Sequence, residues 1–313
     1  MFRRGRRLRD TAIIRDLVRE NELSVKDFIL PIFVVEGENI KREISSLKGN
    51  YHWSVDRLGE LVKELKETGV RSVIIFGVPE HKDCKGTEAY NENGIVQKAI
   101  RKLRELDDEL YIITDVCMCE YTNHGHCGIL HGKSIDNDET LEYLGKIALS
   151  HAKAGAHMIA PSDMMDGRIG YIRKVLDDNG FKMTPIMSYA AKYASGFYGP
   201  FREAAGSAPQ FGDRKGYQMD PANSREAMLE IEADINEGAD IIMVKPAMSY
   251  LDIVREARNR YDVPLCVYNV SGEYAMVKNA GEAGLIDEKR VALEMLISMK
   301  RAGAKMIMTY YAL

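Results

Sequence analysis

Two lysines stand out because each interrupts an otherwise apolar run. Lys192 lies in the segment MSYAAKYASGFYG, and Lys245 lies in the segment MVKPA. Lysine is rarely placed in the apolar interior of a protein, because burial removes its charge from water. A buried lysine amine that has lost its proton can attack a carbonyl carbon and form a Schiff base. The two lysines are therefore candidate nucleophiles.

The positions of these two lysines favour a catalytic role. Their segments are expected to be consecutive strands, the fifth and sixth of the chain, and neighbouring strands lie about 4.8 Å apart. Like charge and burial both lower a lysine pKa, and a drop of about three units from 10.4 leaves a sizeable fraction of the amine neutral near pH 7. The alternative is that one or both side chains extend to solvent at the strand ends. A single lysine would favour that alternative, whereas an adjacent pair shifts the balance.

Three of the five cysteines cluster in the segment DVCMCEYTNHGHCG. Asp115, Cys117 and Cys119 alternate, so in a strand their side chains would share one face, and Cys127 can fold back across the turn at Gly125. Three thiolates favour Zn²⁺ and leave a fourth position open, as in catalytic rather than structural zinc sites. The alternative is three buried cysteines that pack as small apolar residues. For the neighbouring His124 and His126, a supporting or loop role is at least as plausible as ligation.

The elements that carry these residues are short, nearly continuous apolar runs bounded by Gly, Pro or polar residues. Such runs are typical of parallel strands that are buried on both faces. Eight of them are predicted, at residues 28–37, 72–79, 111–117, 156–163, 183–190, 240–247, 264–272 and 304–312.

Amphipathic stretches separate the predicted strands, and several end in glycine, a helix stop signal. The clearest predicted helices cover residues 55–69, 139–155, 224–238 and 287–303. Eight alternations of strand and helix predict an α/β fold, a (β/α)₈ TIM barrel, with an open doubly wound sheet as the competitor. The absence of a glycine-rich dinucleotide fingerprint after the first strand weakens that competitor. Two insertions, at about residues 120–137 and 195–220, follow strand ends, where the active face of a barrel is built.

The composition of the 313-residue chain is that of a soluble globular protein, with 45% hydrophobic and 29% charged residues. The net charge of −4 provides no attraction for polyanions, so no nucleic-acid partner is expected. No run is long enough to span a membrane, and an odd number of cysteines suits a reducing compartment, which predicts a cytoplasmic protein. Five arginines within the first nine residues predict a solvated or subunit-contacting arm. We expect residues 1–24 to form this arm and residues 25–313 to form the catalytic barrel.

Several longer segments together resemble porphobilinogen synthase, also called delta-aminolevulinic acid dehydratase. They are DVCMCEYTNHGHCG, APSDMMDGR, MSYAAKYASGFYGPFREAAGSAP, DRKGYQMDPAN, MVKPAMSYLDIVRE, YNVSGEYAM and MTYYAL. The opening segments RGRRLR and DFILPIFVVEG are also similar to that family, so the resemblance covers nearly the whole chain. It implies a lyase of heme biosynthesis that condenses two molecules of 5-aminolevulinate to porphobilinogen.

The resemblance also assigns roles to particular residues. It implies that Lys245 is the main Schiff-base lysine, that Lys192 is the second, and that the three clustered cysteines hold the zinc of the zinc-dependent branch. The residues matched to substrate contacts are Asp115, Ser162 and Asp163 near the reacting atoms, Arg202, Arg214 and Gln218 in a lid, and Ser271 and Tyr310 as hydroxyls for the second substrate carboxylate. Taken singly, these residues have plainer explanations in surface charge, helix capping and packing.

Three further expectations come from the same resemblance. Glu230 matches a glutamate that holds an allosteric Mg²⁺ in many bacterial members, although a solvated charge in an acidic helix is the default explanation. The arm and the family imply a homo-oligomer, an octamer. Relatives usually continue into a further short helix, whereas this chain stops at Leu313, so the last barrel helix is expected to be missing or replaced by the arm.

Two rival functions remain open on the residues alone. A class I aldolase would use one Schiff-base lysine on the same barrel and would need no zinc. A non-catalytic zinc protein would usually supply four protein ligands and would leave the two lysines unexplained. Metal analysis combined with borohydride trapping separates the three functions. Zinc with two trappable lysines supports the synthase, trapping without zinc supports the aldolase, and zinc without trapping supports the non-catalytic protein.

Overall fold

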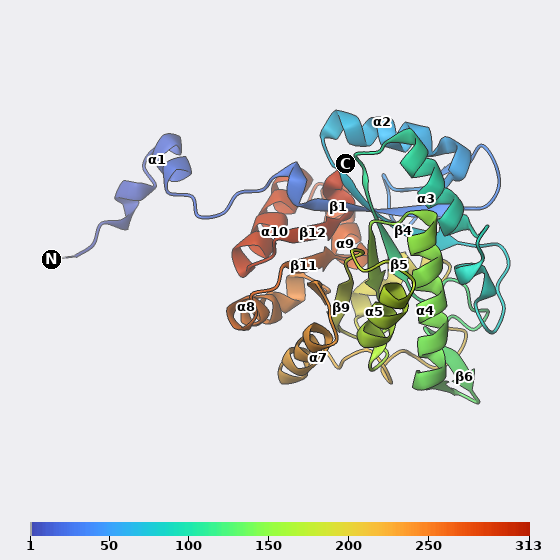
Figure 1. Cartoon of the computed structure of the whole chain (residues 1–313). Helices are drawn as coiled ribbons and strands as arrows, with labels where there is room; N and C mark the ends of the chain where they lie inside the picture. Colours follow the sequence, from blue (N-terminus) through green and yellow to red (C-terminus); the bar gives the residue numbers. More distant parts are fainter. Residues whose placement is uncertain (1) are drawn as a thin grey trace.

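The computed structural model describes residues 2–313, and in this range the predicted barrel is confirmed (Figure 1). The eight strands are β1 (Phe28–Val35), β4 (Ser72–Val78), β5 (Tyr111–Val116), β8 (Met158–Pro161), β9 (Met187–Lys192), β10 (Ile241–Lys245), β11 (Leu265–Asn269) and β12 (Met306–Thr309). They are parallel neighbours in the order β8-β5-β4-β1-β12-β11-β10-β9. A bridge between Ile159 and Ile186 joins the two ends of that order, so the sheet is nearly closed and the open-sheet alternative is wrong.

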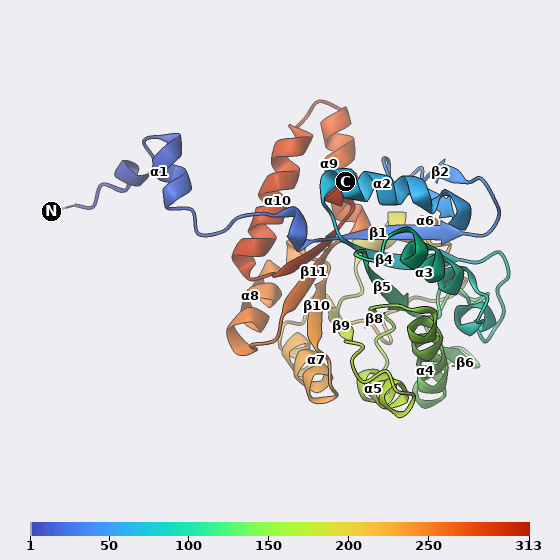
Figure 2. The ribbon, with the colours of Figure 1, turned by 45° about the horizontal axis from the view of Figure 1, so that its top comes forward.

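Helices surround the barrel, as the two ribbon views show (Figures 1 and 2). The longer ones are α2 (Leu58–Thr68), α3 (Ile95–Leu106), α4 (Asn137–Ala154), α5 (Arg168–Asp178), α7 (Arg225–Asn236), α8 (Leu251–Arg260), α9 (Ser271–Glu282) and α10 (Glu288–Ala302). The four predicted helices correspond to α2, α4, α7 and α10, with ends shifted by a few residues. One face of each packs on the strands: in α2, Leu58, Leu61 and Leu65 are all buried.

The continuous apolar runs are explained by two cores on opposite faces of the strands. Along β1, Ile29 and Phe33 point into the barrel, whereas Leu30, Ile32 and Val34 pack against the outer helices. Both faces therefore require apolar side chains, as expected for a parallel sheet covered by helices. Cys266 belongs to the inner core, away from the other buried cysteines.

One strand is displaced from its prediction. The fifth barrel strand, β9, begins at Met187 instead of Met183 and ends on Lys192. Pro185 has no backbone N–H to donate to a strand ladder, which explains why the strand begins after it. The two insertions contain a hairpin of β6 (Ile129–His131) and β7 (Ser134–Asp136), and the short helix α6 (Gly199–Ala204). The small strands β2 (Lys41–Glu43) and β3 (Tyr51–Ser54) follow β1.

The N-terminal segment extends away from the barrel (Figures 1 and 2). Its helix α1 (Ala12–Leu17) has no buried residue, and Phe2, Ile13 and Leu17 are more than 70% exposed. After β12 the described residues form only a 3₁₀ turn, Tyr310–Ala312, so an eighth outer helix is absent from residues 2–313. The arm does not take the place of that helix. No helix in this range is both long and apolar enough to cross a membrane.

A buried ion pair joins α5 to α7. The Arg168 guanidinium, which is 2% exposed, donates to the Asp234 carboxylate at 2.7 Å and to the Ser188 hydroxyl at 3.1 Å. Removing one partner of such a pair leaves an uncompensated buried charge, which costs about 3–5 kcal/mol. We expect Asp234→Asn to lower the free energy of unfolding by roughly that amount, measured by urea denaturation.

The matched control for this prediction is Asp178→Asn. Asp178 pairs with Lys174 on the exposed face of α5. Exposed pairs are screened by water and contribute little, so this variant should unfold like the parent protein. Equal effects of the two substitutions would contradict the prediction.

Candidate active site

The two predicted lysines lie side by side at the carboxyl ends of neighbouring strands. Lys192 ends β9, Lys245 ends β10, and the two are direct partners in the strand register. They are only 4% and 5% exposed. The ammonium group of Lys192 donates to the carbonyl oxygen of Ser162. The carboxyl ends of the strands are where TIM barrels carry their chemistry.

Aromatic rings enclose the amine of Lys245. Its Nζ lies 4.4 Å from the ring centre of Tyr268, 5.0 Å from Phe201, 5.1 Å from Tyr198 and 5.2 Å from Tyr189. Burial, followed by the charge of Lys192, lowers the pKa of Lys245 to about 7. A large fraction of this amine is therefore neutral at neutral pH, which is the state that attacks a carbonyl.

The three clustered cysteines also converge, but not by strand alternation. β5 ends at Val116, so Cys117 and Cys119 lie in the loop that follows it, and the predicted strand through Cys117 is one residue too long. A turn closed by the N–H of Tyr121 on the carbonyl of Met118 bends this loop, and the Met118 side chain enters the outer core. As a result, the side chains of Cys117 and Cys119 point toward the same space.

The geometry of the thiols fits a metal ion. All three cysteines are at most 3% exposed, and their sulfur atoms lie within 4.8 Å of one another. The Sγ atoms of Cys117 and Cys119 are 3.4 Å apart, and no disulfide joins these cysteines. Burial raises the pKa of Cys117, whereas hydrogen bonds from the other two thiols lower the pKa of Cys127. Three converging soft donors can hold a metal ion, and no fourth ligand atom from residues 2–313 joins their group, which leaves a coordination position open.

A small cavity joins the lysines to the thiol cluster. Lys192, Lys245 and Cys119 line it together with Arg202 and Arg214, and its volume is about 10 Å³. Ser162 also lines this cavity. A space of that size holds about one water molecule, so the structure is a closed state. Larger ligands can enter only if part of the wall moves.

Glu120 is a further cavity residue that sequence reasoning missed. Its carboxylate is 2% exposed and accepts from the Cys119 thiol at 3.2 Å. Burial, followed by the neighbouring Cys119, raises the pKa of Glu120 to about 8. The signal that could have revealed it is a charged residue directly after two cysteines of an apolar segment. Phe76, Tyr198 and Phe201 also line the cavity and were not predicted, since aromatic residues are common in any core.

The two predicted aspartates have different surroundings. Asp115 is buried, and its burial raises its pKa well above the ordinary value while the charge of Lys192 opposes that shift. Asp163 accepts from the N–H of Met165 at 2.7 Å and lies 4.0 Å from Arg168. Burial raises the pKa of Asp163 to about 6. The charge of Lys192 acts on both aspartates, but the strongest charged neighbour of Asp163 is Arg168.

The second insertion contributes part of the cavity wall, and we call its residues 199–218 the lid. Arg202 and Arg214 reach the cavity from this lid, and Arg214 donates to the carbonyl of Gly125 at 3.0 Å. Burial and the charge of Arg214 lower the pKa of Arg202. Two neighbouring guanidinium groups suit a carboxylate ligand. The Gln218 amide is buried without a hydrogen-bond partner in residues 2–313, and it lines a different hollow.

The lid contacts the loop that carries the three clustered cysteines, at Gly125. Gly125 has φ +70°, and a Cβ there would lie 2.3 Å from the Ala208 carbonyl oxygen of the lid. We expect Gly125→Ala to hold the lid open, raising KM by about tenfold or more, since a misplacement of roughly 1 Å can cost about 100-fold. Faster proteolysis within the lid should accompany the change.

Gly132→Ala is the control for this lid variant. Gly132 has a similar φ of +66°, but no atom lies within 4 Å of a Cβ placed there. It therefore carries the same backbone strain without the clash. If both variants changed KM equally, strain and not lid closure would be the cause.

Ser271 and Tyr310 adjoin the cavity but do not line it. The Ser271 hydroxyl accepts from the N–H of Phe201 at 3.0 Å and donates to the carbonyl of Phe197 at 3.3 Å. The Tyr310 hydroxyl lies 2.8 Å from that of Tyr268, whose ring covers Lys245. Each hydroxyl therefore contacts a residue, Phe201 or Tyr268, whose ring lies beside the Lys245 amine.

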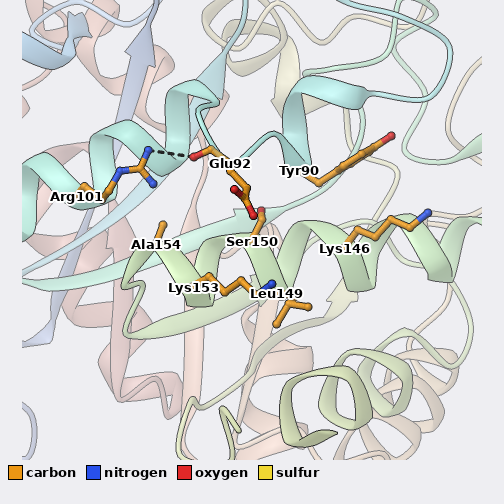
Figure 3. A pocket seen from close by; sticks show the side chains of 8 residues that line it. All are labelled: Tyr90, Glu92, Arg101, Lys146, Leu149, Ser150, Lys153 and Ala154. Atoms are coloured by element: carbon orange, nitrogen blue, oxygen red, sulfur yellow. Dashed lines mark hydrogen bonds between the residues drawn. The ribbon is translucent and has the colours of Figure 1, made fainter. Parts of the chain in front are cut away.

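Larger hollows lie outside this cavity, and two of them differ in their lining. One, of about 490 Å³, is lined by Gln218, Glu230, Asp166 and Glu226, and burial raises the pKa of Glu230. The other, of about 410 Å³, lies between α3 and α4 and is lined by Arg101, Lys146 and Lys153 (Figure 3). None of the residues predicted for chemistry lines the second hollow. Size therefore does not identify the active site, whereas the convergence of titratable groups does.

Comparison with known proteins agrees with this geometry. The family model described as delta-aminolevulinic acid dehydratase matches residues 2–313. The chain is 55% identical over 311 residues to the delta-aminolevulinic acid dehydratase of Bacillus subtilis, covering 99% of this chain and 96% of that protein. It is 54% identical over 313 residues to that of Staphylococcus aureus, covering 99% and 97%.

A solved structure gives the same result. The delta-aminolevulinic acid dehydratase (porphobilinogen synthase) of Toxoplasma gondii, in complex with its reaction product porphobilinogen, superposes with a TM-score of 0.97 at 43% identity. The alignment covers 100% of this chain and 90% of that one. On the barrel, the match to the family model and these identities, the chain belongs to the delta-aminolevulinic acid dehydratase family.

Proposed function

We propose that the chain condenses two molecules of 5-aminolevulinate to porphobilinogen through Schiff bases on Lys245 and Lys192. The reaction is that of its family and is an early step of heme biosynthesis. The observation that carries the lysine assignment is the pair of buried, register-matched amines, one of which has its pKa lowered to about 7.

The lysines act as nucleophiles toward the two substrate ketones. A neutral amine adds to the ketone carbon, and loss of water leaves an iminium that draws electrons from the adjacent carbon. One substrate is then joined to the other by a carbon–carbon and a carbon–nitrogen bond, and the Schiff-base nitrogens return to the lysines. Asp115 and Glu120 are the buried carboxyl groups nearest to this chemistry and can exchange protons with it.

The substrate carboxylates are held by two sets of side chains. We assign one carboxylate to Arg202, Arg214 and Gln218 of the lid, and the other to Ser271 and Tyr310. Orientation by these groups turns an encounter of two substrates into a reaction between fixed partners. Because the closed cavity has a volume of about 10 Å³, the lid must open for substrate entry, and closing it again excludes water from the Schiff bases.

Cys117, Cys119 and Cys127 would hold a zinc ion. When bound, zinc supplies Lewis acidity, which lowers the pKa of an amine or water at its open position. The thiol of Cys119 lines the same cavity as both lysines, which supports a catalytic rather than a purely structural ion.

The proposal extends to assembly and regulation. The exposed apolar residues of the arm support contact with other copies of the chain, and we assign a homo-octamer in the cytoplasm. One hollow is lined by three carboxylates, Glu230, Asp166 and Glu226. Burial, helped by the charges of Asp166 and Glu226, raises the pKa of Glu230, and this cluster of negative charge supports an allosteric Mg²⁺ in the hollow.

The experiment that tests the function is a product assay. Supplied with 5-aminolevulinate, the protein should form porphobilinogen, and borohydride added during turnover should attach substrate to Lys245 and Lys192, as read by peptide mass mapping. Activity that survives a zinc chelator would remove the metal from the proposal. Trapping at a single lysine with no pyrrole product would favour an aldolase.

The pH dependence of trapping provides a further prediction. The neutral amine is the reactive form, so trapping of levulinate at Lys245 should rise with pH around a midpoint near the lowered pKa of about 7. In Lys192→Met the repulsion between the two ammonium groups is lost, so the pKa of Lys245 should rise and trapping at pH 7 should fall. Lys289→Met, which changes an exposed lysine of α10, is the control. An unchanged midpoint in Lys192→Met would exclude charge coupling between the two lysines.

A further inference from the structure

A buried carboxylate, Glu273, lies at the strand ends behind Lys245. Its Oε1 accepts from the N–H of Met248 at 2.7 Å, and its Oε2 accepts from the N–H of Val270 at 3.0 Å. Oε2 also accepts from the side-chain amide of Asn269 at 3.0 Å. The residue is 2% exposed.

The hydrogen bonds continue across a third strand. The Thr309 hydroxyl donates to the Asn269 amide oxygen at 2.9 Å, and these two residues are register partners at the ends of β12 and β11. Both are 0% exposed. Glu273, Asn269 and Thr309, which we call the Glu273 network, thus join the ends of β10, β11 and β12 through Met248, three residues beyond Lys245.

Burying the Glu273 carboxylate lowers the stability of the fold. Every donor to Glu273 is a neutral amide, and burial raises the pKa of the carboxyl to about 7. A buried carboxylate without a cation is expensive to maintain. A simple cap for α9 does not require burial, since a solvent-exposed Ser or Asp serves equally well. The position of the network therefore calls for a role beyond capping.

The three strand ends that the network joins carry one proposed substrate site. Lys245 ends β10, Ser271 follows β11 by two residues, and Tyr310 directly follows Thr309 of β12. Because these three residues lie at the ends of neighbouring strands, we pair them on one substrate: Lys245 binds its ketone, and the hydroxyls of Ser271 and Tyr310 bind its carboxylate. The distance between these groups must then match the length of that substrate.

We propose that the Glu273 network is a positioning device that sets the distance from the Lys245 amine to the hydroxyls of Ser271 and Tyr310. It thereby selects a keto acid of one length. This inference rests on the proposed function, because the two hydroxyls hold a carboxylate only if that proposal is correct. The network residues touch no substrate and act through the backbone of Lys245, Ser271 and Tyr310.

The test uses two ketones that differ only at the far end. Levulinate has a carboxylate two methylene groups from its ketone, and 2-pentanone has a methyl group in its place. Rates of borohydride trapping at Lys245 are measured with each ketone in the parent protein, in Glu273→Gln and in Glu282→Gln. Glu282 is an exposed residue of the same helix that pairs with Lys48 at the surface, so its variant is the matched control.

The expected result is a selective loss. In Glu273→Gln an NH₂ group replaces one acceptor oxygen, and this group cannot accept from the N–H that faces it. Trapping of levulinate should fall at least about tenfold, since a misplacement of roughly 1 Å can cost about 100-fold. Trapping of 2-pentanone should stay within about twofold, as for substitutions that disturb no functional contact. Glu282→Gln should keep the preference of the parent protein.

Other outcomes overturn the inference. If trapping of both ketones fell equally, Glu273 would affect only the reactivity of Lys245 or the stability of the fold. If trapping of neither ketone fell, Glu273 would only cap α9. If Glu273→Gln fails to fold, two variants of Thr309 test the inference instead. The preference for levulinate should fall in Thr309→Val, which lacks the hydroxyl, and should be largely retained in Thr309→Ser, which keeps it. If the parent protein traps neither ketone at Lys245, the proposed function itself has failed.

Discussion

Lys245→Met should abolish porphobilinogen formation. We expect a loss of at least about 10⁴-fold, because removing the nucleophile of a covalent mechanism usually removes most of its rate enhancement. Methionine is close to lysine in length and is apolar, so it fits among the rings of Tyr268, Phe201 and Tyr198 without leaving a charge to bury. The protein should therefore fold while borohydride trapping at position 245 disappears.

Two comparisons make this result specific. Lys289→Met, at an exposed position of α10, should leave activity unchanged. Lys192→Met should also lose product formation, yet should retain trapping at Lys245 at a pH above its raised pKa. Turnover in Lys245→Met at a rate near that of the parent protein would show that the amine is not the nucleophile.

The second large effect is expected at the thiol cluster. Cys119→Ala should lower activity by more than about 100-fold, since changing even the outer partners of metal ligands costs 10–100-fold. Bound zinc, measured by elemental analysis, should fall in parallel. Chelation of the parent protein should give the same loss, and added zinc should reverse it.

Cys84→Ala is the control for the cluster, because Cys84 is exposed and lies outside it. Its activity and zinc content should match those of the parent protein. A Cys119→Ala protein that kept its activity after losing zinc would make the cluster structural. One that kept its zinc but lost activity would place Cys119 in chemistry other than metal binding.

The charges around the cavity explain why its parts depend on one another. Lys192, Lys245, Arg202 and Arg214 face it with Glu120 and the Cys119 thiol. Burial, followed by the charge of Lys192, lowers the pKa of Lys245, and the weaker effects of Asp115, Cys119 and Glu120 raise it. Loss of one group should therefore change the protonation of the others, because electrostatic interactions are strong where water is excluded.

The features that the sequence predicted correctly are those that depend on residues close together along the chain or on the order of the strands. Apolar runs identified all eight barrel strands, because a parallel strand buried on both faces requires apolar residues throughout. The adjacency of Lys192 and Lys245 followed from strand order alone, since consecutive strands of a barrel are neighbours. The cysteine cluster was recognised from its spacing, although the reason given for its convergence, strand alternation beyond Val116, was wrong.

Tertiary structure alone decided the rest. The closed cavity, the contact between Gly125 and the lid, the role of Glu120 as a wall of the site, and the Glu273 network each join segments that are distant in sequence or lie in loops. Loops have no periodic pattern, so the sequence does not show where they meet. Burial, which moves the pKa of Lys245 to about 7 and that of Glu120 to about 8, exists only once the whole barrel and its lid are assembled.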